Sequence, residues 1–207
     1  MRTPLLLAAA LATALPGAAQ SFNAEYFKGD RKAIMAACAD KARAIKPKDS
    51  RLLAEYGRAY LASGDRAKAE DAFAAAIASD PKDGETHFLI GYAWSMNGFK
   101  PEALAAWDKM VAMDPKGKNS MTKAALVLMD TGNEAKAAEL MEKAWMLDPK
   151  DWQNCVEFAR ACLRNGKKDL AAAWFERTVQ ARPKEERMWN EIALAYADGG
   201  VPARTTF

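Results

Sequence analysis

Residues 50–83 read SRLLAEYGRAYLASGDRAKAEDAFAAAIASDPKD, and the prolines and glycines of this stretch recur through the chain. The sequence repeats a proline (Pro47, Pro81, Pro115, Pro149, Pro183) and a glycine (Gly64, Gly98, Gly132, Gly166, Gly200), each returning after 34 residues. A fixed period of this length is the signature of a stacked array in which each unit is one supersecondary structure. The sequence therefore predicts an all-α repeat protein.

Each unit holds two helical patterns. In residues 50–83 the apolar residues Leu53, Tyr56 and Tyr60 are three or four positions apart, so they share one face of a helix. Gly64 is expected to end this helix, because glycine adopts the left-handed conformation at little cost. A second apolar pattern follows and stops at Pro81, since a residue that precedes proline is disfavoured in the α conformation. We expect two helical arms, each of about 14 residues.

Small and bulky residues keep fixed places in the unit when Ser50 is numbered as position 1. Position 8 is small (Gly57, Gly91, Ala125, Ala159, Ala193), position 20 is alanine (Ala69, Ala103, Ala137, Ala171) and position 24 is bulky (Phe73, Trp107, Met141, Phe175). Small residues opposite large ones let two helix backbones approach each other. With its proline at position 32, this pattern resembles the tetratricopeptide repeat family from Ser50 to about Gly200. The resemblance implies a right-handed α-solenoid of stacked antiparallel helix pairs.

The register divides the chain into a leader, an N-terminal segment, four full repeats and a cap. The predicted boundaries are 1–19 for a signal peptide, 20–49 for a segment with a half-repeat helix, 50–83, 84–117, 118–151 and 152–185 for the repeats, 186–200 for a C-terminal capping helix and 201–207 for a tail. The half-repeat helix, expected at 32–45, is a second arm without its first arm. The cap is a first arm without a second arm, and such arrays need closing elements. Its residues Trp189, Ile192, Ala193 and Tyr196 are expected to face the stack.

Residues 1–19 have the plan of a secretory signal peptide. Arg2 gives a positive start, residues 5–15 are apolar except for Thr13, and small residues follow up to Ala19. The apolar run is too short to span a bilayer, which needs about 20 residues. We expect cleavage after Ala19 and no stable membrane insertion afterwards. The alanine-rich run is typical of bacteria, so the expected location is the periplasm.

The ionisable residues do not suggest catalysis. The single histidine, His87, falls at a core-facing position, and no cluster of further ligands accompanies it. The chain has no G-x-S-x-G motif and no glycine-rich phosphate loop. Its formal charge of +3 creates no overall field for nucleic acid. We therefore expect a protein that is not an enzyme, with no catalytic residue, cofactor, metal site or nucleic-acid partner.

The three cysteines, Cys38, Cys155 and Cys162, are predicted to be buried, apolar in character and unpaired. Cys155 and Cys162 are seven residues apart on one helix. That separation is roughly 10 Å at 1.5 Å per residue, beyond the reach of a disulfide. Three tryptophans outside the strict core positions are expected on the convex side or bridging neighbouring units (Trp145, Trp152, Trp174).

The concave face is the remaining candidate for function. In the family it is lined mainly by positions 2, 5, 9, 12 and 13 of the first arms. Transferred to this chain, those positions give an apolar middle with arginines towards both ends. The candidate partner-binding residues are Arg58, Phe88, Tyr92, Met96, Leu126, Met129, Arg160 and Arg164. Aromatic and methionine-rich surfaces suit adaptable protein binding. The alternative interpretation is that Phe88, Leu126 and Val156 belong to internal packing.

The resemblance thus implies a non-catalytic scaffold of the cell envelope that binds a protein or peptide partner of unknown identity. The alternative is a structural protein that self-associates, with the apolar strip as a homo-oligomer interface. The carboxylate clamp with which some family members hold chaperone tails is not implied. Of the residues at its positions, only Lys123 matches.

Overall fold

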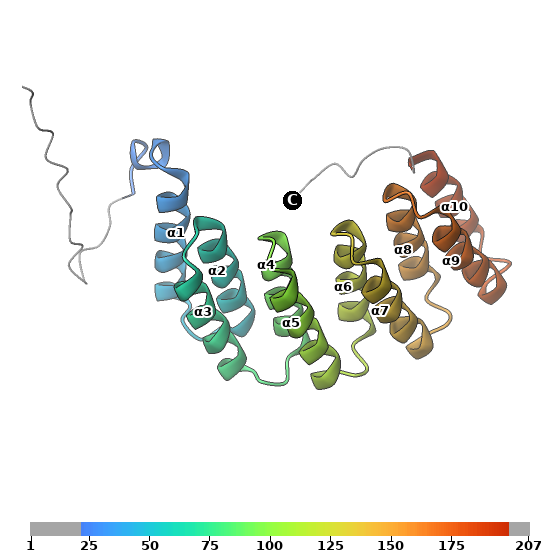
Figure 1. The fold of residues 1–207 in the computed structure, drawn as a ribbon, viewed down its shortest axis with the longest axis horizontal. Coiled ribbons are helices and arrows are strands. Elements are labelled where there is room, and N and C mark those ends of the chain that lie inside the picture. Colours follow the sequence, from blue (N-terminus) through green and yellow to red (C-terminus); the bar gives the residue numbers. More distant parts are fainter. Residues whose placement is uncertain (1–21, 199–207) are drawn as a thin grey trace, which may run out of the picture.

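The computed structural model describes residues 22–198, and all regular structure within them is helical (Figure 1). The elements are a 3₁₀ helix, η1 (Tyr26–Lys28), and the α-helices α1 (Arg31–Ile45), α2 (Ser50–Ser63), α3 (Arg66–Ser79), α4 (Gly84–Met96), α5 (Lys100–Met113), α6 (Lys118–Asp130), α7 (Glu134–Leu147), α8 (Trp152–Arg164), α9 (Lys168–Ala181) and α10 (Glu186–Asp198). Helices α2 to α9 form four pairs that stack in a curved row, with α1 and α10 at its two ends (Figure 1). The predicted all-α solenoid of stacked helix pairs is confirmed. The predicted signal peptide and tail lie outside the described residues.

The arms begin and end where short-range chemistry dictates. Asp49 precedes α2, and its Oδ1 accepts a hydrogen bond of 3.1 Å from the backbone N–H of Leu52. This caps one of the amides that have no partner within the helix. At the other end Gly64 has a φ of 92°, a left-handed conformation in which a side chain would be strained. The three equivalent glycines of the later repeats also have positive φ.

Close packing of the two arms explains the small residue at position 8. A Cβ atom added to Gly57 would lie 2.2 Å from the Phe73 ring, and one added to Gly91 would lie 2.3 Å from Nε1 of Trp107. That indole N–H donates a 3.3 Å hydrogen bond to the backbone carbonyl of Phe88. The bulky residue of the second arm therefore lies directly against the backbone of the first arm, as the small-to-large pattern predicts.

The two kinds of arm contact their neighbours differently. Each first arm packs directly on the next, in the order α2, α4, α6, α8 and α10. The second-arm side is joined from helix to helix by ion pairs. These are Lys68–Asp40 at 2.9 Å, Arg43–Asp71 at 2.7 Å, Arg66–Glu102 at 2.9 Å, Lys136–Asp108 at 2.7 Å and Arg177–Glu142. We call these ion pairs the second-arm ladder.

The prediction for the last helix is wrong for Trp189 and Ala193, whereas Ile192 packs against the core and the Tyr196 ring meets that of Phe175 on α9. Met188 and Ala195 are the buried residues of α10, whereas Trp189 and Tyr196 are 48% and 57% exposed. Ala193 is exposed as well. Positions 4, 8 and 11 of a first arm are buried in every full repeat. On α10 they lie open, because no second arm follows it within residues 22–198.

Burial was also mispredicted at Cys38, whereas the predicted bridging of units by tryptophans is confirmed for Trp145 and Trp174. Cys38, on α1, is exposed, whereas Cys155 and Cys162 are buried. Cys38 occupies position 23, and the described residues before α1 contain no first arm to cover it. Trp174 is only 3% exposed and so belongs to the core. It meets Trp145 of the preceding repeat edge to face at 6.1 Å, so this pair bridges two units.

Candidate partner-binding face

Position 9 of successive repeats marks a continuous surface on the first arms. It is occupied by Arg58, Tyr92, Leu126, Arg160 and Leu194. We call this surface the first-arm face. Arg58 and Leu194 are exposed, and the other three are partly buried. The face therefore has two half-buried apolar side chains in the middle and an arginine on either side of them.

The middle of the first-arm face is a connected cluster on α4 and α6. The rings of Phe88 and Tyr92 stack with their centroids 6.2 Å apart. Lys123 Nζ lies 5.4 Å from the centroid of the Phe88 ring and pairs with Glu85 Oε1 at 2.9 Å. Ser120 Oγ donates to the other oxygen of Glu85 at 3.2 Å. The aromatic stack thus carries a charged, hydrogen-bonded edge supplied by two neighbouring repeats.

Sequence reasoning does not predict the pair between Glu85 and Lys123. The only available signal is their separation of 38 residues, which is one 34-residue period plus one helical turn. A residue at this offset lies on the next first arm, slightly further along it. Ser120 and Glu85 are 35 residues apart, which is one period plus one residue.

The predicted site residues divide between the surface and the core. Phe88 is 8% and Met129 1% exposed, so both contribute mainly to packing. Tyr92 and Leu126 are half-buried, and Met96 is 48% exposed. These last three can therefore contact a partner without rearrangement.

Both predicted arginines of α8 connect neighbouring first arms. Arg160 has a side chain only 17% exposed, and it pairs with Glu157 at 2.6 Å and with Glu191 of α10 at 2.9 Å. Arg164 reaches Asp130 of α6 at 3.5 Å. The spacing of Glu157 and Arg160 on one helix could have indicated the first pair. In contrast, Arg58 pairs with Glu55 of its own helix.

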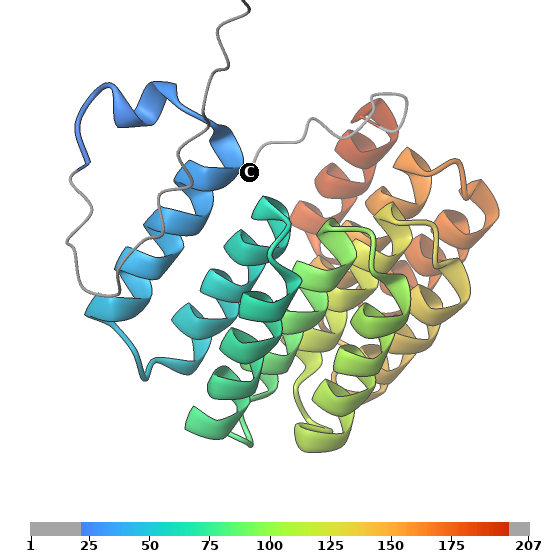
Figure 2. The ribbon, with the colours of Figure 1, turned by 60° about the vertical axis from the view of Figure 1, so that its left-hand side comes forward.

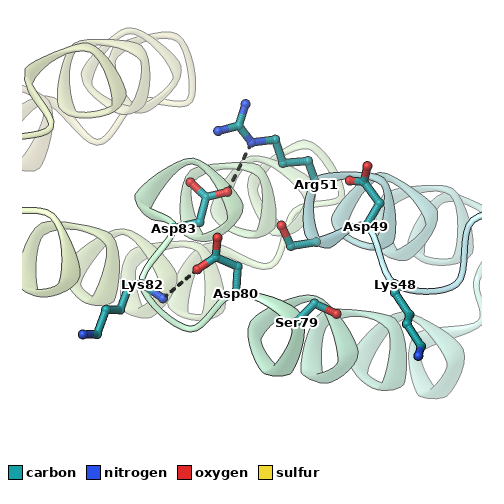
Figure 3. Close-up of a pocket in the computed structure, with 8 residues that line it drawn as sticks. Lys48, Asp49, Arg51, Ser79, Asp80, Lys82 and Asp83 are labelled. Carbon is teal, nitrogen blue, oxygen red and sulfur yellow. Dashed lines mark hydrogen bonds and ion pairs between the residues drawn. The ribbon is translucent and has the colours of Figure 1, made fainter.

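A polar pocket of about 650 Å³ lies at the turns that enter α2 and α4 (Figure 3). Arg51 Nε donates to Asp83 Oδ2 at 3.2 Å. Partial burial alone would raise the pKa of Asp83, but hydrogen bonds from Arg51 and Thr86 bring that pKa below its ordinary value. A related pocket lies at the next turn, beside Lys118 and Asp148. Because the pocket recurs with the repeat, we interpret it as a feature of the inter-repeat turn.

Residues 22–198 lack two features. They contain no group of three or more histidine, cysteine, aspartate or glutamate side chains placed to hold a metal ion. Separately, none of their helices has both the length and the apolar character required to cross a bilayer.

Comparison with known proteins identifies the family. One family model described as a tetratricopeptide repeat matches residues 55–117, and a second model with the same description matches residues 128–194. The two stretches together make up more than half of the chain, so the protein belongs to the tetratricopeptide repeat family. Two crystal structures of MamA align with it. The first is 21% identical in sequence, and the alignment covers 81% of this chain and 99% of that chain. The second is 22% identical, and the alignment covers 79% of this chain and 88% of that chain. Both have a TM-score of 0.48. No curated protein matches.

Proposed function

We propose that the protein is a non-catalytic scaffold that holds a protein or peptide segment on the first-arm face. Membership of the tetratricopeptide repeat family supports a protein-interaction role in general. The observation that favours this face is the cluster on α4 and α6, where the half-buried Tyr92 stacks on the buried ring of Phe88 beside the Lys123–Glu85 pair. Aromatic side chains fixed by their neighbours make good anchors, because little conformational entropy is lost on binding.

The chemistry of the cluster suits an extended segment. Tyr92, Leu126 and Met96 offer apolar contact area, while the Lys123 side chain, 51% exposed, can donate a hydrogen bond to an acidic group or a main-chain carbonyl. Arg58 provides a further exposed cation one repeat away. Arg160 is less available, because reaching a partner would require it to leave Glu157 and Glu191.

We test this proposal with Tyr92→Ala in the purified protein, used to capture partners from an envelope fraction. A binding anchor that is truncated to alanine typically costs about 2 kcal/mol or more, which is roughly thirtyfold in affinity. Met146→Ala is the matched control, since Met146 is an apolar side chain 70% exposed on α7. Capture that survives Tyr92→Ala but fails with Met146→Ala would place the binding surface elsewhere. Light scattering of the unbound protein tests the alternative, self-association through the first-arm face, which Tyr92→Ala should also weaken.

We further propose that this binding takes place in the cell envelope, in the periplasm of a bacterium. The support is the sequence of residues 1–19, with its basic start, apolar run and small residues before Gln20. N-terminal sequencing of the protein from fractionated cells should find Gln20 or a close neighbour as the first residue. Recovery of Met1 on a folded cytoplasmic protein would contradict the proposal.

A further inference from the structure

The two ends of the described array are complementary halves of one repeat. Position 4 is at most 4% exposed in the four full repeats, but Trp189 at this position of α10 is 48% exposed. Position 11 is at most 6% exposed in the same repeats, but Tyr196 is 57% exposed. Position 8, between them, packs against position 24 of its own second arm in the first two repeats, and Ala193 at this position of α10 is exposed. On its other side Tyr196 still meets Phe175 of the preceding second arm, with ring centroids 5.3 Å apart. Helix α10 is thus a first arm whose second-arm contact surface is open.

Helix α1 shows the converse. Position 23 of a second arm is buried in the four full repeats, and in repeat 4 it contacts Trp145 of the preceding second arm. In the same repeat, Trp174 at this position meets Phe158 of the first arm with ring centroids 5.5 Å apart. On α1 this position is Cys38, which is exposed. Residues 22–29 do not cover it, although Tyr26 of η1 hydrogen-bonds to the carbonyl of Ala33 near the start of α1.

Bulk and charge also match between the two helices. Position 24 is bulky in the full repeats but is Ala39 on α1. Between α1 and α10 the large side chains are instead Met35, at position 20 of α1, and Trp189, at position 4 of α10. Helix α1 has four basic residues and one acidic residue, whereas α10 has three acidic and one basic (Arg31, Lys32, Lys41, Arg43, Asp40; Glu186, Glu191, Asp198, Arg187). Opposite net charge favours the approach of one end to the other.

We propose that α10 of one copy docks against α1 of a second copy and completes a repeat, so that copies assemble head to tail. The occupant is a second copy because its α1 provides the missing second arm, with the matching position exposed and the opposite charge. Residues 199–207 of the same chain are poorer candidates, since they include Gly199, Gly200 and Pro202, which disfavour a helix. A contact between unlike surfaces does not close on itself unless the rotation forms a ring, so the expected product is a filament or a ring.

The first experiment introduces a cysteine opposite Cys38. In repeat 4 position 7 meets position 23, so Ile192→Cys on α10 should face Cys38 of the next copy. Oxidation of the purified variant should give a ladder of dimers, trimers and larger species on a non-reducing gel. Asn190→Cys is the matched control on another side of the same helix, and it should give no ladder. Adding Cys38→Ser to Ile192→Cys should abolish the ladder.

The second experiment measures assembly without crosslinking. Sedimentation of the wild-type protein from about 1 to about 100 µM should show a weight-average mass that rises at least about twofold. Cys38→Arg and Trp189→Ser should each lower that mass towards the monomer, while Met146→Ser, at an exposed apolar position on α7, should leave it unchanged. Cys38→Arg changes an exposed side chain, so its effect does not depend on the stability of α10.

Three results would overturn the proposal. The first is a wild-type protein that stays monomeric at the highest concentration while Ile192→Cys gives no ladder. The second is a dimer of the Ile192→Cys, Cys38→Ser variant, which would indicate a tail-to-tail contact. The third is assembly that starts only when residues 199–207 are removed, which would make them the occupant. Tyr92 lies on α4, away from both ends, so failure here is distinguishable from failure of partner capture.

Discussion

At the scale of single residues, burial divides the three cysteines into two kinds. Burial raises the pKa of both Cys155 and Cys162 to about 12, so almost no reactive thiolate is present at neutral pH. Cys38 is exposed. We expect one thiol to react quickly with a thiol reagent in dilute native protein, where copies are separate, and three to react after denaturation without reductant. Cys38→Ser should remove the fast reaction, and a denatured count of one would indicate a disulfide.

His87 predicts a pH dependence of stability. Its Nδ1 is buried without a hydrogen-bond partner. Burial first, and then the charge of Lys109, lower the pKa of His87 below its ordinary 6.5, although Asp83 opposes them. Below pH 6.5 the unfolded chain therefore takes up a proton that the folded protein resists, so the free energy of unfolding falls as the pH drops through this value.

The measurement is urea unfolding at about pH 7.5 and about pH 5, for the wild type and His87→Leu. Leucine is the residue at this position in the first repeat, Leu53, so the variant retains an apolar core residue. The wild type should lose more stability than the variant between the two pH values. Equal losses would show that His87 is protonated equally easily in both states.

At the scale of the helix pair, the contact between Gly91 and Trp107 sets the distance between two arms. Gly91→Ala should destabilise the protein by about 1–3 kcal/mol, because the added methyl group overlaps the indole. Trp107→Met in the same chain should recover part of the loss, since repeat 3 pairs Ala125 with Met141 at these positions. A double-mutant cycle from urea denaturation measures this coupling. Additive effects would mean that the two side chains do not limit each other.

Arg160 is the second prediction at this scale. Arg160→Glu would place a third carboxylate beside Glu157 and Glu191, so we expect α10 to detach from α8. Hydrogen exchange in residues 186–198 should become faster and the melting temperature should fall. Arg58→Glu is the control, because Arg58 is exposed and pairs with Glu55 on its own helix. Unchanged protection of α10 would show that Met188 and Ala195 hold it without the ion pair.

The helix pairs could be predicted because their determinants are local and repeated. The glycine that ends each first arm and the small residue at position 8 report directly on turn and packing geometry. Prediction failed where a repeat lacks a neighbour. Trp189 and Cys38 occupy core positions in the register, but burial at those positions depends on a helix that residues 22–198 do not supply.

At the scale of the whole molecule, the overall arrangement followed from the sequence because each repeat contacts mainly its neighbours. The candidate site was harder to predict, since family positions cannot distinguish a half-buried side chain from a fully buried one. Tyr92 and Met129 both lie on the expected face, yet Met129 is 1% exposed and Tyr92 remains accessible. Ion pairs between repeats, such as Arg160–Glu191, depend on which rotamers meet across two helices.

The second-arm ladder gives the array unequal stiffness across its width. Neighbouring first arms pack directly on one another and add a few ion pairs such as Lys123–Glu85, whereas second arms are joined by partly exposed ion pairs such as Arg66–Glu102 and Lys136–Asp108. Salt screens such pairs but does not weaken apolar packing. We therefore expect the curvature of the helical array to decrease at high ionic strength while the helices stay folded. Small-angle X-ray scattering would detect this as a salt-dependent radius of gyration at constant helix content.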